Sequence, residues 1–228
     1  AVSRILLRPR NGIDYIIAIY KYICFFFWCN KNFQIVHLHG FTTKSILLIF
    51  LAKLFKKKVI VKMSSVGFDD PLSLKKRGFL LYKSFSKADT FVGISEQFKT
   101  LYEKSSLPRK KFVLIPNGVD TDRYSPVNQK ERDNLRSQLG LPSSMKIILF
   151  VGHFSREKCP NVVFDAWKRL ANDTRIDSGI VFIGATDEEH HEVDPKVVDE
   201  VRKSVAPFVG DRVFFVERTR EIEKYYQS

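Results

Sequence analysis

The sequence of 228 residues predicts an α/β protein made of two doubly wound parallel-sheet units, and three observations favour this fold. Short apolar runs rich in β-branched residues alternate with longer segments of helical periodicity, as in successive β-α-β units. The alternation pauses once, over a polar stretch that begins at Pro116-Asn117-Gly118 and extends through Pro142. Hydrophobic residues make up 44% of the chain, which is enough for a core in each unit.

The elements are expected in a regular order on both sides of this pause. The predicted strands cover residues 34–38, 59–61, 90–94, 112–115, 146–151, 180–183 and 212–216. The predicted helices cover residues 43–55, 73–86, 95–105, 128–139, 160–172, 195–206 and 219–228. We place the domain boundary after Ser125, so residues 1–125 form one Rossmann-like domain and residues 126–228 form a linker with a second one.

The N-terminal apolar stretch from Ile13 to Cys29 predicts a buried or interfacial helix. Asp14 and Lys21 interrupt it, so it falls short of the about 18 uninterrupted apolar residues that a membrane span needs. Arginines precede the stretch and no small-residue cleavage site follows it, which argues against a signal peptide. The three cysteines form no even framework and no CxxC pair, so neither a disulfide scaffold nor a zinc site is expected. We therefore expect a cytoplasmic protein.

The positive charge is concentrated in the first half of the chain. Up to Ser125 there are 22 Lys and Arg against 8 Asp and Glu, a net +14, whereas the remainder has 16 against 17. This imbalance predicts an anionic surface or an acidic ligand as a partner of the first half. Its aromatic residues lie in apolar runs such as Cys24–Trp28, which favours a core or a membrane surface over nucleic-acid stacking. Peripheral contact with an anionic membrane is thus a hypothesis, and nucleic acid is not an expected partner.

Lysines at the end of the apolar segment Ile46–Phe55 leave two interpretations open. Lys53 and the run Lys56–Lys58 suit an interfacial helix that lies on a membrane. They suit equally a buried helix, because a helix C-terminus favours positive charge.

The segment Val151–Pro160 predicts a binding loop for a diphosphate. It follows a predicted strand, and ligands of such folds lie beyond the carboxyl ends of the strands. Gly152 permits a close backbone turn, and Pro160 suits the first turn of the next helix, whose N–H groups attract anions. Arg156 and Lys158 add full positive charges at that place. A solvated basic loop is the alternative interpretation.

Four segments together resemble the retaining glycosyltransferases of family 4, which have the GT-B fold. They are Ile35–Gly40, Ala88–Ser95, Pro116–Pro126 and Phe150–Lys158, in the family's order. The resemblance implies two Rossmann-like domains, the second truncated in this chain. It implies transfer of a sugar from a nucleotide-sugar, often a UDP-sugar, to a glycan or lipid-linked acceptor held by the N-terminal domain. It implies no metal and no other cofactor.

The resemblance also implies which residues contact the substrates. The expected donor diphosphate residues are Gly152, His153, Arg156 and Lys158. Lys158 matches the family's lysine, and His153 stands where members commonly have arginine. The weaker candidates for the nucleotide are Glu217, Arg218 and Thr219, and those for the acceptor or sugar side are His39, Ser65, Gly67 and Asp69. The expected interdomain hinge is Pro116, Asn117 and Gly118.

One family element is missing from the sequence. The E-x7-E element, which holds the ribose and lies near the sugar, normally follows a helix like Glu221–Tyr226, and the chain stops at Ser228. The start is also short of the family's usual glycine-rich first loop. We therefore expect a fragment of a longer enzyme, which could be inactive alone.

Two acidic or histidine-rich clusters are candidate metal sites. Asp120-Thr121-Asp122 spells a DxD motif, but after Asn-Gly it favours a turn or a helix cap. His190 and His191 lie among acidic residues and favour a solvated loop. No metal site is predicted.

The sequence leaves functions of different classes open. The favoured one is a nucleotide-sugar glycosyltransferase at the inner face of the cytoplasmic membrane, in surface polysaccharide or glycolipid synthesis. The alternative is a non-catalytic binding module of the same fold, whose basic half binds anionic lipid or nucleic acid. A sugar-nucleotide epimerase of the same architecture fits the order of linker and loop less well.

Overall fold

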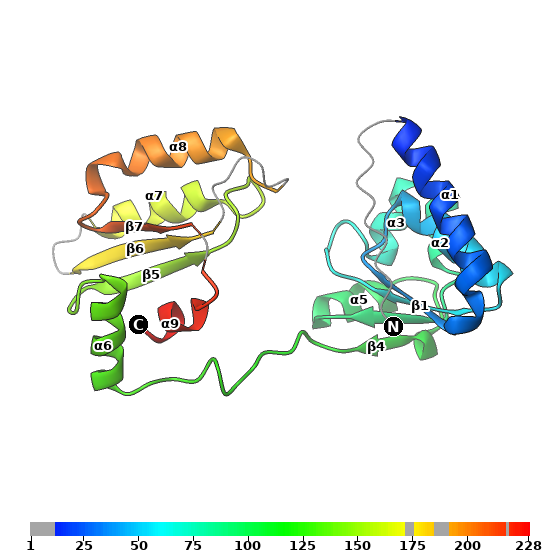
Figure 1. The fold of residues 1–228 in the computed structure, drawn as a ribbon, viewed down its shortest axis with the longest axis horizontal. Helices are drawn as coiled ribbons and strands as arrows, with labels where there is room; N and C mark the ends of the chain where they lie inside the picture. Colours follow the sequence, from blue (N-terminus) through cyan, green and yellow to red (C-terminus); the bar gives the residue numbers. More distant parts are fainter. Residues whose placement is uncertain (1–11, 172–175, 185–191, 218) are drawn as a thin grey trace. The chain divides into compact units, whose positions relative to one another are not determined.

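The computed structural model describes residues 12–171, 176–184, 192–217 and 219–228 (Figure 1). The chain divides into two compact units between Gly118 and Val119. Each unit contains one parallel β-sheet with its own hydrophobic core, which confirms the predicted α/β class.

The sheet of the first unit has four parallel strands in the order β1-β2-β3-β4. The strands are β1 (Ile35–His39), β2 (Lys58–Lys62), β3 (Thr90–Gly93) and β4 (Phe112–Leu114). The helices are α1 (Gly12–Cys29), α2 (Thr43–Leu54), α3 (Pro71–Arg77), α4 (Phe79–Phe85) and α5 (Glu96–Glu103), with short 3-10 turns η1 (Asn30–Asn32) and η2 (Arg109–Lys111). The single helix predicted over residues 73–86 is two helices, because Gly78 adopts a φ of 144° that ends α3.

The connecting helices of the first unit pack on one face of its sheet. Each new strand joins the same edge of the sheet, and right-handed crossovers then place each connecting helix on the same face. Along β2, Val59 and Val61 are buried in the core, whereas Ile60 points to the opposite face. Ile35 and Val113 share the face of Ile60 by the strand register and are 55% and 43% exposed. The alternation of strands and helices predicts that helices cover both faces of the sheet. In the described part of this unit, helices cover one face.

Asp89 ties three elements of the first unit together. Its Oδ2 accepts hydrogen bonds from Lys53 Nζ at the end of α2 and from the backbone N–H of Val59 in β2, at 2.5 and 2.7 Å. Lys58 Nζ lies 3.8 Å from its other carboxylate oxygen. Burial raises the pKa of Asp89, but the Lys53 and Val59 hydrogen bonds outweigh it, and the pKa lies below its ordinary value.

Asp89→Asn should flatten the acid limb of the stability profile. A carboxyl whose folded pKa is depressed stabilises the protein above its unfolded pKa, and that stability is lost as pH falls through the folded value. Urea unfolding of the variant should therefore lose less stability than wild type below about pH 4. Asp199→Asn, on the exposed side of α8, is the matched control and should retain the wild-type profile. Parallel profiles for wild type and Asp89→Asn would contradict this role.

The second unit has three parallel strands in the order β5-β6-β7. The strands are β5 (Lys146–Val151), β6 (Ser178–Ile183) and β7 (Val213–Val216). The helices are α6 (Gln129–Leu139), α7 (Pro160–Ala171), α8 (Pro195–Val205) and α9 (Ile222–Gln227), with the 3-10 turn η3 (Ala206–Phe208).

Both faces of the second sheet are covered. On one face Phe150 and Phe182 pack with Phe154 and with Trp167 of α7 in a core that also includes α8. On the other face Val181 belongs to a second cluster, which residues of α6 and α9 complete. The crossover helices α7 and α8 share one face by the same rule as in the first unit, and α6 and α9 cover the other (Figure 1).

The segment that follows Gly118 belongs to the second unit. Arg123 Nη2 donates to Glu223 Oε2 of α9 at 2.7 Å, and Gln227 Nε2 of α9 donates to the carbonyls of Arg123 and Ser125. The structure therefore divides between Gly118 and Val119, whereas the sequence placed the boundary after Ser125. The residues in these contacts are about a hundred positions apart in the sequence, so no local pattern predicts that this segment packs on α9.

The described helices include none that is both long and apolar enough to cross a membrane.

Candidate functional site

The carboxyl ends of β5, β6 and β7 meet at one edge of the second sheet. Gly152, directly after β5, donates its N–H to the carbonyl of Ile183 at 2.9 Å, and Gly184 donates to the carbonyl of Val216 at 3.1 Å. The loop after β5, the end of β6 and the residue Glu217 after β7 therefore share this edge. This is where ligands of parallel α/β sheets bind.

The backbone of the loop after β5 lies directly against Gly184. A Cβ at position 184 would lie 1.8 Å from the carbonyl oxygen of Gly152, a distance that no side chain tolerates. Gly152 is among the predicted site residues, and Gly184 is not. Its position at the end of the predicted strand 180–183 was the available signal.

Gly184→Ala should displace the loop after β5 and destabilise the second unit by about 2 kcal/mol, because a backbone atom cannot yield as a side chain does. Chemical denaturation measures this change. Gly118→Ala is the matched control, since a Cβ there would meet nothing within 4 Å. Equal stability of the two variants would show that the loop accommodates a methyl group without cost.

Two basic side chains of the loop lie beside carboxylates. His153 Nε2 is 3.2 Å from Glu192 Oε2, and Arg156 Nε is 3.2 Å from Asp194 Oδ2. Between them Phe154 is fully buried and anchors the loop in the core, while its carbonyl accepts the N–H of Asp194. An anionic ligand at this edge would compete with Glu192 and Asp194 for these side chains.

Lys158 differs from Arg156 in its surroundings. Its side chain is exposed and has no acidic partner among the described residues. Its Cγ and Cδ would lie 3.7 and 3.8 Å from a Cβ on Gly152, so its stem covers the glycine that starts the loop. Lys158 also stands two residues before α7, whose positive N-terminal end begins at Pro160. The loop thus presents one exposed ammonium at a helix N-terminus, an arrangement suited to a phosphate oxygen.

The weaker nucleotide candidates after β7 have partners within the protein. Glu217 Oε1 accepts a hydrogen bond from Arg202 Nη2 of α8 at 3.3 Å. The hydroxyl of Thr219 accepts the N–H of Glu221 at 3.0 Å, next to the start of α9. Arg218 lies outside the described residues. Their roles towards a nucleotide stay predictions.

In the first unit, the loop after β2 is organised by its two aspartates. Asp69 accepts hydrogen bonds from the N–H and hydroxyl of Ser64 and from the N–H of Ser65, at 2.8 to 2.9 Å. Asp70 accepts the N–H of Gly67 and caps α3. Both aspartates are 1% exposed. Asp69 therefore shapes the loop with oxygens directed inward, whereas Ser65 and Gly67 are exposed at its surface.

His39 lies exposed at the end of β1, where the sequence placed it. Its ring centroid is 4.5 Å from that of His37, since both point to the same side of the strand. Burial, then the nearby His39 and Lys62, lower the pKa of His37. Lys62 donates to Asn117 Oδ1 at 2.8 Å and so joins β2 to the predicted hinge residues. Lys62 is not among the predicted site residues, although it directly follows the predicted strand 59–61.

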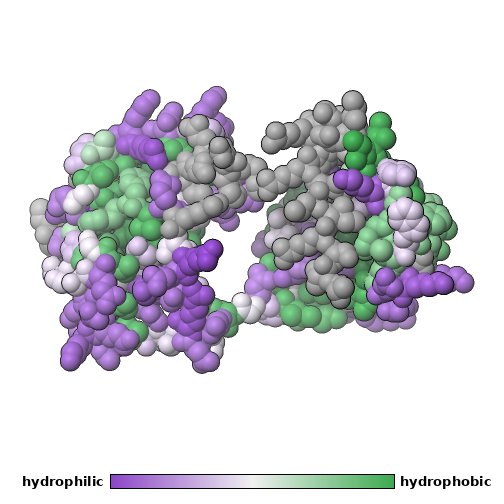
Figure 2. Space-filling model, in the orientation of Figure 1, coloured by the Kyte–Doolittle hydropathy of each residue, from purple (hydrophilic) through white to green (hydrophobic). Residues whose placement is uncertain are grey.

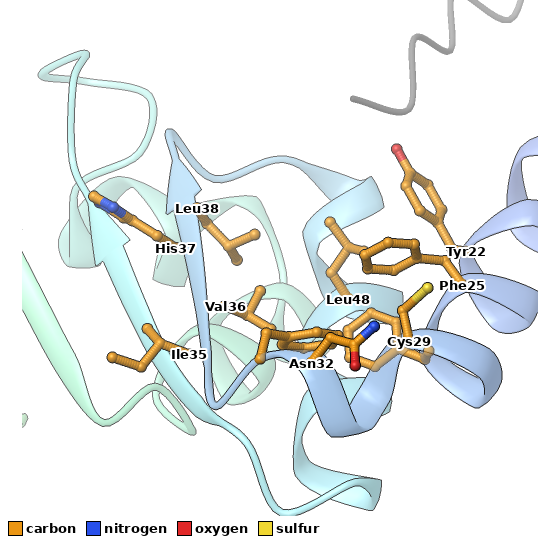
Figure 3. A pocket seen from close by; sticks show the side chains of 11 residues that line it. Tyr22, Phe25, Cys29, Asn32, Ile35, Val36, His37, Leu38 and Leu48 are labelled. Atoms are coloured by element: carbon orange, nitrogen blue, oxygen red, sulfur yellow. The ribbon is translucent and has the colours of Figure 1, made fainter. Parts of the chain in front are cut away.

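A cavity of about 600 Å³ lies on the other side of β1, against α1. Figure 3 shows Phe25 and Tyr22 of α1 and Leu48 of α2 across from β1, with His37 directed away from them. The lining is mostly aromatic and aliphatic. The polar side chains among its lining residues are Tyr22, Cys29, Asn32 and His37.

The described residues contain no group of three or more His, Cys, Asp or Glu side chains that could hold an ion. Asp120 Oδ1 accepts the N–H groups of Asp122 and Arg123, which confirms the predicted turn. His190 and His191 lie outside the described residues.

The family model described as "Glycosyltransferase Family 4" matches residues 4–123, just over half of the chain. The chain belongs to glycosyltransferase family 4.

Curated relatives of this family 4 chain include the D-inositol 3-phosphate glycosyltransferase of Corynebacterium jeikeium, 28% identical over 111 residues, which are 48% of this chain and 26% of the relative. The alpha-maltose-1-phosphate synthase of Mycobacterium tuberculosis is 28% identical over 106 residues, which are 46% of this chain and 25% of the relative. These alignments thus span about a quarter of each relative.

Solved structures extend the similarity over both units. A glycosyltransferase from Rickettsia africae superposes with a TM-score of 0.68 at 18% identity, covering 96% of this chain and 56% of the other. Anabaena Alr3699/HepE in complex with UDP and glucose superposes with a TM-score of 0.64 at 16% identity and the same coverage. These similarities confirm the expected GT-B fold. The family 4 chain spans just over half the length of these structures.

Proposed function

We propose that this family 4 chain is part of a retaining glycosyltransferase. It moves a sugar from a nucleotide-sugar, a UDP-sugar, to a glycan or lipid-linked acceptor in surface polysaccharide or glycolipid synthesis. The observation that carries the proposal is the loop after β5, where Gly152 and Lys158 stand between a strand end and the N-terminus of α7. A nucleoside diphosphate is the leaving group that such a loop suits.

The donor diphosphate would be held by the chain's own cations. Lys158 is exposed and meets a phosphate oxygen first, and the N-terminus of α7 adds its partial positive charge. Arg156 leaves the carboxylate of Asp194 and binds a phosphate oxygen of the ligand, so that one charge-assisted contact replaces another. Negative charge grows on the diphosphate as the sugar leaves, so these groups stabilise the transition state more than the ground state. The proposal requires no metal and no cofactor.

The nature of the donor is supported by the similar structures. Alr3699/HepE was solved in complex with UDP and glucose and with UDP-glucose. In the present chain the nucleotide would lie towards Glu217, Arg218 and Thr219 at the end of β7. UDP binding would separate Glu217 from Arg202 if the carboxylate takes part.

The nature of the acceptor is supported by charge and by the relatives' names. The basic first half of the chain suits an anionic or lipid-linked acceptor. Relatives include a D-inositol 3-phosphate glycosyltransferase and, at 26% identity over 112 residues, an alpha-galactosylglucosyldiacylglycerol synthase of Streptococcus pneumoniae. His39, Ser65 and Gly67 stand at the carboxyl edge of the first sheet, where the acceptor hydroxyl would be held. Pro116–Gly118, at the division of the units, serves as the hinge.

We place the enzyme in the cytoplasm, in peripheral contact with the inner face of the cytoplasmic membrane. Nucleotide-sugars are charged and water-soluble, whereas a lipid-linked acceptor stays in the bilayer. The enzyme must therefore work at the boundary between water and the bilayer.

The test is stabilisation by ligands that differ only in phosphate. UDP should raise the melting temperature by about 5 °C at a concentration 100 times its Kd. UMP should have a smaller effect and uridine almost none, because the loop after β5 binds the diphosphate. No response to millimolar UDP, together with salt-sensitive binding to DNA, would favour the binding-module alternative.

A further inference from the structure

An apolar and aromatic surface lies on the outer side of α1 and α2 in the first unit. It consists of Ile16, Tyr20, Phe27 and Trp28 of α1 with Phe50 and Leu54 of α2, each more than half exposed. We call it the α1–α2 face. In Figure 2 the surface over α1 shows green patches between pale and purple ones, and hydrophilic side chains project beside its C-terminal end.

The α1–α2 face is the side of these helices that the core does not use. Ala18 and Phe26 of α1 are buried, and Ile16, Tyr20 and Phe27 recur at helical spacing on the opposite side. Ile49 and Ala52 of α2 are buried in the same way, while Phe50 and Leu54 are four residues apart and point outward. The helices pack against each other, and the rings of Phe27 and Phe55 meet at 5.1 Å. Their outward rows therefore lie on adjoining helices.

The charge around the α1–α2 face is predominantly positive. From Ile16 to Ala88 the sequence contains 13 Lys and Arg and only two acidic residues, Asp69 and Asp70. Both aspartates are 1% exposed and bonded within their own loop. Lys21, Lys31 and Lys56 are exposed on or beside α1 and α2. The next acidic residue, Asp89, is paired with Lys53 of α2, so the exposed charge of this part of the molecule is mostly positive.

We propose that the α1–α2 face docks on an anionic lipid bilayer. Exposed aromatic and aliphatic side chains gain free energy by entering the boundary between headgroups and acyl chains, and the lysines around them attract anionic headgroups. Nucleic acid would use aromatic stacking and positive charge but would leave Ile16 and Leu54 against water or phosphate. An acidic protein would also pair with the lysines, but the excess of positive charge is spread over several elements, which better matches the extended negative surface of a bilayer.

This docking deepens the proposed function, since it would hold the acceptor side of the enzyme at a lipid-linked substrate. The benefit of docking to the enzyme rests on the proposed function, whereas the docking itself does not depend on it. The experiment uses neither donor nor acceptor, so failure of docking and failure of sugar transfer are distinguishable.

The two tryptophans of the chain make a direct measurement possible. Trp28 is 82% exposed on the α1–α2 face, whereas Trp167 is 1% exposed in the core of the second unit. Vesicles of phosphatidylcholine with 30% phosphatidylglycerol, about a third of the lipid as in strongly anionic membranes, should shift the emission to shorter wavelength. Pure phosphatidylcholine vesicles should give at most a small shift. The shift should vanish in Trp28→Phe while this variant still sediments with the anionic vesicles.

A charge-reversal pair tests the role of the lysines. Lys21→Glu with Lys31→Glu should weaken sedimentation with anionic vesicles at least about tenfold, because each lysine near the surface contributes about 1 kcal/mol. Lys196→Glu with Lys203→Glu, on exposed positions of α8, makes the same change in net charge and should retain binding within about twofold. Circular dichroism and the melting temperature show that each variant is folded.

Three outcomes would overturn the proposal. The first is an unchanged Trp28 spectrum with anionic vesicles. The second is equal weakening by both lysine pairs, which would show that net charge alone acts. The third is a DNA duplex that binds the chain and abolishes vesicle binding without any Trp28 shift, which would assign the face to nucleic acid.

Discussion

Replacing Lys158 by alanine should lower kcat for sugar transfer about 100-fold, while the melting temperature stays within about 1 °C. The ammonium is exposed, lies at the N-terminus of α7 and has no acidic partner among the described residues. In the proposed donor site, its loss therefore removes a positive charge that faces the leaving diphosphate. It leaves no buried group unpaired. Transfer kinetics with a UDP-sugar in the active, full-length protein, with calorimetric Kd values for UDP in this chain, measure both effects.

The control for Lys158→Ala is Lys168→Ala, an exposed lysine in the last turn of the same helix. It should leave kcat and the Kd for UDP within about twofold. Lys158→Arg should recover part of the loss, because the charge remains near the diphosphate. Transfer by Lys158→Ala within a few-fold of wild type would remove Lys158 from the donor site.

Replacing Arg136 by methionine should destabilise the second unit by about 3 kcal/mol. Arg136 is buried on α6, where its Nη1 donates to the carbonyls of Pro142, Ser143 and Met145 at 2.8 to 3.0 Å, and its Nε to that of Ser228. Methionine fills most of the volume but donates to none of these oxygens. The turn before β5 therefore loses the group that organises it.

Arg132→Met is the control for Arg136→Met, since Arg132 lies one turn earlier on α6 and is exposed. It removes the same charge and should change the free energy of unfolding by less than about 0.5 kcal/mol. Denaturant unfolding followed by Trp167, buried in the same unit, reports the difference. Equal stability of the two variants would mean that the four carbonyl contacts contribute nothing net.

At the loop after β5, local sequence signals predict the secondary structure but not the contacts of the loop. An apolar run, a glycine, charged residues and a proline are all local signals, and the structure has a strand, a loop and a helix where they predicted them. The partners of the loop are not local. Glu192 and Asp194 lie about forty residues away beside His153 and Arg156, in a segment whose acidic residues the sequence suggested only as a solvated loop.

Asp69 shows the opposite case. Its place in a loop after a strand made it a candidate for the sugar side, and the structure turns its carboxylate to the N–H groups of Ser64 and Ser65. Lys62 was absent from the prediction and joins β2 to Asn117. The direction of a side chain depends on the backbone path of its loop, which residue types alone do not specify.

The sequence by itself determined the α/β class, the two units and the strand-loop-helix order at Gly152–Pro160, because periodicity, turns and helix starts are local properties. It also determined the basic first half. Only the tertiary structure decided the strand order, in which each new strand joins the same edge of its sheet. The connecting helices of the first unit therefore share one face. The same structure joined Val119–Ser125 to α9 and left the α1–α2 face outside the core. These features depend on contacts between distant segments, whose free energy no single segment encodes.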